Sequence, residues 1–290
     1  MLRSSGNPLT ILAAMLGDTW KMKLRNKLLS EQPFCVFCGG KAKASTVDHL
    51  PARTFFRPRN RPQGLEFSAC APCNSGSRID EMVASLISRA YPDAKSEAEK
   101  AELIKIVKGI RNNCPGILTE LIPDREQEER AHRRMSSDPD FGGAMNAGGP
   151  LVRNILNRFA AKAGLALHYE LTKEIVHETG GVCVWFYPNE ALFAGNLPND
   201  LIAMLGNPTT LRQGKKEVGD QFSYSSGVAA DNNLSAHFAT FRLSFAICAV
   251  VSNDFETVEK LSLENKNNVV SIFRPGFLKS TGDQNGGTPK

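Results

Sequence analysis

The chain has 290 residues and a mass of 31.7 kDa, with 41% hydrophobic and 22% charged residues. A chain of this length can bury a core, and we expect more than one module, while the composition excludes collagen-like, mucin-like and wholly disordered proteins. No apolar run approaches the roughly 18 residues that a membrane-spanning helix needs, and no signal-peptide cleavage site follows the first apolar run. We therefore expect a cytoplasmic protein without a membrane partner.

The formal net charge of +5 is unevenly distributed along the chain. Residues 1–80 contain 12 basic and 5 acidic residues, whereas residues 81–290 contain 23 and 25. Clustered Lys and Arg favour contact with a polyanion, because neutralised phosphates release counterions. An ordinary solvated basic surface is the alternative. Within the basic region, residues 8–29 have apolar residues at helical spacing, which predicts a helix that packs on the following module.

Seven cysteines follow, and four of them form two CxxC pairs, Cys35 with Cys38 and Cys70 with Cys73, with 31 residues between the pairs. Two such pairs can complete a tetrahedral zinc site, because each brings two thiolates to one ion. The odd number of cysteines argues against a disulfide framework. We expect the remaining cysteines to be small core residues: Cys114, Cys183 and Cys248.

The segment between the pairs reads Val47-Asp48-His49-Leu50-Pro51, and Asn74 directly follows Cys73. In this order, the CxxC, DHxP and CxxCN elements resemble the HNH endonuclease superfamily, in its zinc-stapled branch of the endonuclease VII type. The resemblance covers residues 33–82 and implies a ββα-metal finger with a structural zinc ion and cleavage of DNA to 5′-phosphate and 3′-hydroxyl ends.

The resemblance also implies a role for each motif residue. Asp48 and Asn74 would hold a catalytic divalent ion, Mg²⁺ or Mn²⁺, which prefers oxygen ligands. His49 would be the general base that activates water, since imidazole accepts a proton near pH 7. Asn74 could also cap the following helix, although Ser77 with Asp80 is the expected capping box.

Two positions depart from the family pattern. The family usually carries an Asn about five residues before the third cysteine, but residues 63–67 here contain none. A Lys commonly follows the CN pair by three residues, and Ser77 stands there with Arg78 next to it. Contact with phosphate could therefore come from Arg78.

Residues 53–61 are rich in arginine and precede the second cysteine pair. Two prolines prevent a regular helix across residues 53–62, and guanidinium groups bind phosphate in two-pronged fashion, so we expect a clamp on the nucleic-acid backbone. Phe55 and Phe56 suit either the core or base stacking. The expected clamp consists of Arg53, Arg57, Arg59 and Arg61.

Periodicity predicts helices over residues 79–90, 96–110, 124–135 and 151–167, of which the third is a polar, solvated helix. A loop is expected over residues 138–150. Strands are expected over 182–187, 221–225 and 268–273, and 238–251 should form one bent strand or a hairpin. We expect His168, His177 and His237 to be ordinary polar or core residues.

The predicted fold is α+β, with a zinc-stapled finger near the N-terminus, a helical linker region and a C-terminal α+β domain. The expected division is a helix in 1–30, the nuclease module in 31–82, helices in 83–137, the α+β domain in 151–278 and a disordered tail in 279–290. The C-terminal domain could bind a second copy or a regulatory partner. The competing hypotheses are an inactive zinc-finger protein that binds nucleic acid or acts as a scaffold, and a nuclease that acts on RNA.

Overall fold

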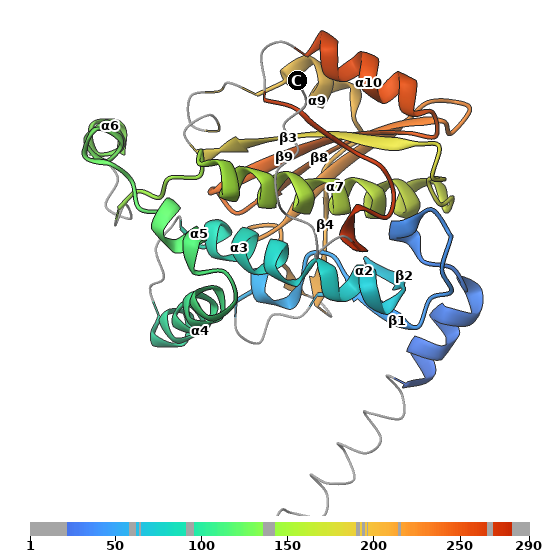
Figure 1. Ribbon diagram of the computed structural model, residues 1–290, viewed down its shortest axis with the longest axis horizontal. Helices are drawn as coiled ribbons and strands as arrows, with labels where there is room; N and C mark the ends of the chain where they lie inside the picture. Colours follow the sequence, from blue (N-terminus) through green and yellow to red (C-terminus); the bar gives the residue numbers. More distant parts are fainter. Residues whose placement is uncertain are drawn as a thin grey trace, which may run out of the picture.

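The fold is mixed α+β, as predicted, and is arranged in layers (Figure 1). The computed structural model describes residues 22–57, 62–63, 65–90, 96–135, 143–189, 192, 195, 197–213, 216–265 and 269–279. Helix α10 (Phe255–Glu264) covers one face of a six-stranded sheet, and helix α7 (Pro150–Thr172) covers the other. The motif-bearing N-terminal elements lie on the far side of α7.

The N-terminal part contains a small hairpin followed by two helices. Residues 22–31 are helical, and the rest of the predicted helix over 8–29 lies outside the described residues. Strands β1 (Thr46–His49) and β2 (Glu66–Ala69) pair antiparallel, with His49 opposite Glu66. The short helices η1 (Val36–Cys38) and η2 (Arg53–Phe55) flank β1, and α2 (Ala71–Gly76) and α3 (Arg78–Ser88) follow β2.

The predicted helices over 79–90, 96–110 and 124–135 are confirmed by α3, α4 (Glu97–Asn113) and α6 (Arg125–Met135). Helix α5 (Pro115–Glu120) was not predicted. The expected capping box at Ser77 is wrong, because the Ser77 side chain makes no cap hydrogen bond, whereas Ser96 and Glu99 cap α4 reciprocally. Helix α6 buries no residue and projects from the body, as its polar sequence predicts.

The sheet is antiparallel between all neighbours in the order β10-β3-β9-β8-β7-β4. The apolar stretch 238–251 forms a hairpin, and the strand predicted over 221–225 begins only at Ser223. The strands are β3 (Gly181–Pro188), β4 (Thr209–Thr210), β7 (Ser223–Val228), β8 (Leu234–Phe241), β9 (Phe245–Ser252) and β10 (Ser271–Phe273). The remaining elements are β5 (Arg212–Gln213), β6 (Lys216–Glu217), α9 (Asn199–Met204) and η3 (Phe277–Lys279).

One continuous apolar core joins the hairpin region to the sheet through α7. The Phe55 ring stacks on Phe159 of α7 at 5.2 Å and lies 5.3 Å from the ring of Phe241. Phe55 and Phe56 are buried, so they belong to the core rather than to a base-stacking surface. The expected module boundary after residue 82 falls within α3, and the division into modules stays a prediction.

None of the helices in the described ranges is long and apolar enough to cross a membrane.

Candidate metal centre and hairpin site

The four motif cysteines form one buried cluster. The sulfur atoms of Cys35, Cys38, Cys70 and Cys73 all lie within 4.8 Å of one another, and no other metal-ligand group of this kind occurs in the described part of the chain. Cys35 precedes η1 and Cys38 is its last residue, and Gly39 follows in the left-handed conformation that glycine adopts most readily (φ 68°). The second pair flanks the first turn of α2. This cluster could hold a metal ion such as zinc.

Hydrogen bonding and burial shift the pKa values of the cluster thiols in opposite directions. A hydrogen bond from Cys73 lowers the pKa of Cys35 to about 5, against the opposing effect of burial. The same hydrogen bond, together with burial, raises the pKa of Cys73. The hydrogen bond therefore favours the thiolate form of Cys35, and a bound metal would favour the thiolate form of all four residues.

The end of the described chain covers the cysteine cluster. Segment η3 packs on α2, and the Gly276 N–H donates a hydrogen bond of 2.8 Å to the Phe37 carbonyl between the first two cysteines. A Cβ atom at Gly76 would lie only 1.9 Å from the Leu278 carbonyl oxygen, so glycine permits this close approach. The cluster thus joins the two ends of the fold.

Asp48 points into the protein. Its side chain is 6% exposed, and its Oδ2 atom lies 2.7 Å from the ammonium nitrogen of Lys162, which projects from α7 and is 0% exposed. Lys162 also forms an ion pair with Glu81 of α3 and donates a hydrogen bond of 2.9 Å to the Ser77 hydroxyl. Burial alone would lower the pKa of Lys162, but the charges of Asp48 and Glu81 raise it, so the lysine is charged.

His49 points to the opposite face, as alternation along a strand requires. Its side chain is 57% exposed, and Nδ1 lies 3.5 Å from Oε1 of Glu66, its partner across the hairpin. The carboxylate lies where it can orient the ring. The other ring nitrogen, Nε2, is then the one able to take a proton from a bound water.

Asn74 ties α2 to the hairpin. Its amide Nδ2 donates a hydrogen bond of 3.0 Å to the Thr46 hydroxyl, and the residue lies inside α2. The alternative role as a helix N-cap is therefore wrong, because Cys70 occupies the N-cap position of α2 and Ser77 that of α3.

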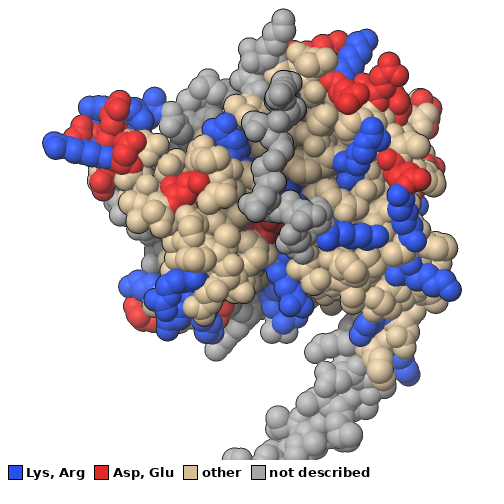
Figure 2. Space-filling view, viewed as in Figure 1, with Lys and Arg blue, Asp and Glu red and all other residues tan. Residues whose placement is uncertain are grey.

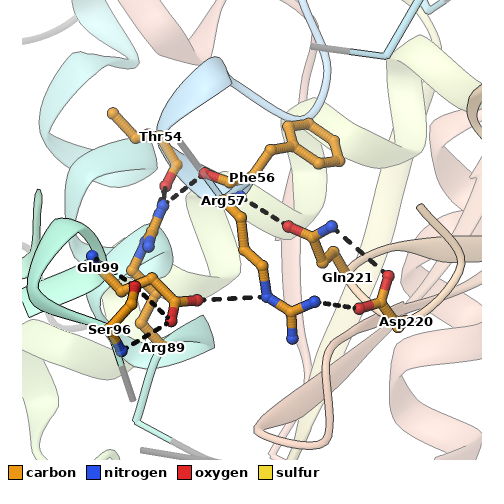
Figure 3. A network of polar contacts seen from close by, with 8 residues as sticks. All are labelled: Thr54, Phe56, Arg57, Arg89, Ser96, Glu99, Asp220 and Gln221. Atoms are coloured by element: carbon orange, nitrogen blue, oxygen red, sulfur yellow. Dashed lines mark hydrogen bonds and ion pairs between the residues drawn. The ribbon is translucent and has the colours of Figure 1, made fainter. Parts of the chain in front are cut away.

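Arg57 is held in a network that crosses the protein (Figure 3). Its guanidinium forms ion pairs with Glu99 of α4 at 3.2 Å and with Asp220 at 2.6 Å, while its backbone N–H donates to the Gln221 side chain at 2.6 Å. The loop that follows η2 is thereby joined to the helical region and to the sheet. This predicted clamp residue already has carboxylate partners.

Arg89 of the same network braces η2 from below. Its guanidinium donates hydrogen bonds of 2.9 and 2.6 Å to the Thr54 carbonyl and of 2.7 Å to the Phe56 carbonyl (Figure 3). Arg242 lies near this group, and burial followed by the charges of Arg89 and Arg57 lowers its pKa to about 10. The guanidinium groups of Arg57, Arg89 and Arg242 thus lie near one another, together with the carboxylates of Glu99 and Asp220.

The other predicted clamp residues differ in position. Arg53 and Arg78 are exposed, and Arg59 and Arg61 lie outside the described residues. On the face shown in Figure 2, basic and acidic side chains are interspersed, and the projecting helix α6 carries both. This view shows no broad surface of a single charge.

His168 and His237 are both buried and form a hydrogen-bonded chain, which confirms the core role expected for His237, whereas His168 is more deeply buried than the ordinary polar position expected for it. His237 contacts the hydroxyls of Ser226 and Ser235, each at 2.8 Å, and Ser235 also contacts His168 at 2.8 Å. Burial, followed by the influence of His168, lowers the pKa of His237 to about 3, so the ring is neutral. His177 is exposed.

Comparisons with family models, curated proteins and solved structures gave no match. The functional assignment therefore depends on the motifs and on the geometry of this site.

Sequence reasoning missed three residues of the site: Lys162, Glu81 and Glu66. Lys162 is a charged residue within the otherwise apolar run Phe159 to Leu167. A lysine in such a run would be buried and would need a carboxylate partner, and this could have been read from the sequence. Glu66 becomes visible only once the hairpin register is known, because it lies 17 residues after His49.

Proposed function

We propose that this protein is an HNH-type endonuclease that hydrolyses phosphodiester bonds in DNA, with His49 as the general base. The observation that carries the proposal is the position of His49, which lies on the solvent face of a hairpin flanked by two cysteine pairs and followed by helices. The same order of motifs gave the resemblance in the sequence. A four-cysteine zinc site would brace a hairpin that is too short to be stable alone.

The divalent ion implied by the resemblance does not fit the carboxylate as it is placed. Asp48 and Asn74 have the right donor chemistry, but the Asp48 Oδ2 atom already contacts a buried ammonium group at 2.7 Å. We therefore assign no step of the reaction to a divalent ion held by these residues.

The chain's own residues account for part of the chemistry. His49 would take a proton from the attacking water, and Glu66 would stabilise the imidazolium that forms. The exposed Arg53 and Arg78 guanidiniums would bind the phosphate backbone without reading base sequence. Such contacts suit DNA and also RNA, so the substrate class is the first thing to compare in an assay.

A second function, nucleic-acid binding without cleavage, is favoured by one specific observation. Asp48, which the resemblance assigns to the catalytic ion, and Arg57, which the arginine pattern assigns to the backbone clamp, both have intramolecular ion-pair partners. A zinc-braced binding or scaffolding module would retain this arrangement without any need for chemistry.

The test is nicking of supercoiled plasmid by zinc-loaded protein, with and without added Mg²⁺ or Mn²⁺ and with an RNA of similar length alongside. We expect cleavage by wild type and by His177→Ala, an exposed histidine outside the hairpin, and a loss of at least about 100-fold in His49→Ala. DNA binding without cleavage under every condition would establish the second function instead. Equal cleavage by wild type and His49→Ala would overturn the role of His49.

A further inference from the structure

The ammonium group of Lys162 is surrounded by oxygen atoms, as a metal ion in a binding site would be. This group donates hydrogen bonds to the Ser77 hydroxyl at 2.9 Å and to the Glu81 carboxylate, and it lies 2.7 Å from the Asp48 Oδ2 atom in an ion pair without hydrogen-bond geometry. The ring of Phe37 lies 5.3 Å from the same nitrogen. The side chain is 0% exposed, so no solvent competes for these contacts.

A second buried ion pair joins α7 to α3 beside the pair between Lys162 and Glu81. Arg158, one turn earlier on α7, forms a buried ion pair at 3.1 Å with Asp80, which precedes Glu81 on α3. Two cations of α7 thus meet two carboxylates of α3, and Asp48 adds a third carboxylate to the lysine end. Each of these carboxylates therefore has a cationic partner within the protein, although the Asp48 Oδ2 atom accepts no hydrogen bond.

A divalent ion and this ammonium group cannot both occupy the buried side of Asp48. A magnesium or manganese ion bound to Oδ2 would need to lie about 2.0–2.2 Å from that atom, and the positively charged lysine nitrogen lies only 2.7 Å from it. The lysine has no ready alternative position, because α7 is buried between the hairpin region and the sheet. Withdrawing it would leave Asp48 and Glu81 as buried carboxylates without a counterion.

We propose that Lys162 is the permanent cation of the Asp48 carboxylate, and that it positions strand β1 in place of a divalent metal ion. The protein then binds no divalent ion through Asp48 while α7 is in place. The inference concerns the site of the proposed nuclease and rests on that proposal for its bearing on catalysis. Within that proposal, Asp48 and Lys162 fix the strand that presents His49, and neither of them touches the substrate.

Titration of zinc-loaded protein with Mn²⁺, followed by the electron paramagnetic resonance signal of the free ion, tests this directly. We expect wild type and Asp48→Asn to bind Mn²⁺ equally, within about twofold. Lys162→Gln should gain a site at least tenfold tighter than any in wild type, and adding Asp48→Asn to that variant should remove it. Lys100→Gln, an exposed lysine on α4, is the matched control and should gain nothing.

The inference is overturned if wild type binds one Mn²⁺ and Asp48→Asn weakens that binding tenfold or more. A folded Lys162→Gln that gains no site would equally contradict the role of the ammonium group. If Lys162→Gln does not fold, the comparison between wild type and Asp48→Asn decides the matter alone. A Mn²⁺ site at Asp48 would leave the nuclease proposal standing, whereas failure of the His49→Ala comparison would leave this inference standing.

Discussion

The two faces of strand β1 have opposite environments. Asp48 is buried against Lys162 of α7, whereas its neighbour His49 is 57% exposed beside Glu66. The motif places both residues in one active centre, but the fold separates them by the alternation of side chains along the strand. Of these adjacent motif residues, one therefore holds the strand against the body of the protein and the other is open to solvent.

The difference follows from the size of the hairpin. Strands of four residues bury too little surface to be stable alone, so one face must be fastened to the body of the protein. The buried face supplies that attachment through Asp48, and the cysteine cluster supplies it at the ends of the hairpin. Only the exposed face is left for the proposed reaction.

Loss of the metal cluster should have the largest effect on folding. Cys73→Ser removes one of four thiolates, and structural zinc contributes on the order of 10 kcal/mol in zinc-finger peptides. We expect one zinc per chain in wild type, none after purification of Cys73→Ser, and loss of the cooperative unfolding transition. Cys114→Ser, outside the cluster, should retain one zinc, and zinc retention by Cys73→Ser would contradict the assignment.

Removal of the buried ammonium should come next. Lys162→Ala leaves two buried carboxylates without their cation, which should lower the free energy of unfolding by about 3–5 kcal/mol. Lys100→Ala, whose partner Glu97 is exposed, should cost less than about 1 kcal/mol. Urea unfolding at pH 7 measures both. Equal effects would mean that Lys162 is not the brace of the hairpin.

Acidification should destabilise the C-terminal region through His237. Its pKa of about 3 lies below that of an unfolded histidine, so the unfolded state takes up the proton first and stability falls as pH drops from 7. Burial raises the pKa of Asp80 to about 6, against the opposing charge of Arg158, and this favours the folded state over the same range.

The histidine contribution is isolated by a variant, since Asp80 is common to both proteins. Between pH 7 and pH 5, wild type should lose about 2 kcal/mol more unfolding free energy than His237→Gln. Urea unfolding at the two pH values gives the difference. Identical pH dependence in the two proteins would show that His237 does not titrate as its burial requires.

Substitutions on the exposed face of the hairpin should hardly change the free energy of unfolding. His49→Ala and Glu66→Gln should each change the free energy of unfolding by less than about 0.5 kcal/mol, because both side chains lie in solvent. Within the proposed nuclease, Glu66→Gln should lower the cleavage rate several-fold. A loss of stability above about 2 kcal/mol in either variant would show that this face is structural after all.

The sequence was sufficient for the local features and insufficient for the long-range ones. The helices near residues 79–90, 96–110 and 124–135 followed from periodicity, and the cysteine cluster followed from spacing. The pairing of Asp48 with Lys162 joins residues 114 positions apart, and no local pattern encodes it. Helix α10 was missed because its apolar face is interrupted by charged residues.

The central claim is that Asp48 and Lys162 form the brace of the hairpin, and a double-mutant cycle tests it most directly. The unfolding free energies of wild type, Asp48→Asn, Lys162→Met and the double variant are measured in urea at pH 7. We predict a coupling energy of about 1.5–3 kcal/mol, because the second substitution should cost little once the first partner is gone. Additivity within about 0.5 kcal/mol would contradict the account.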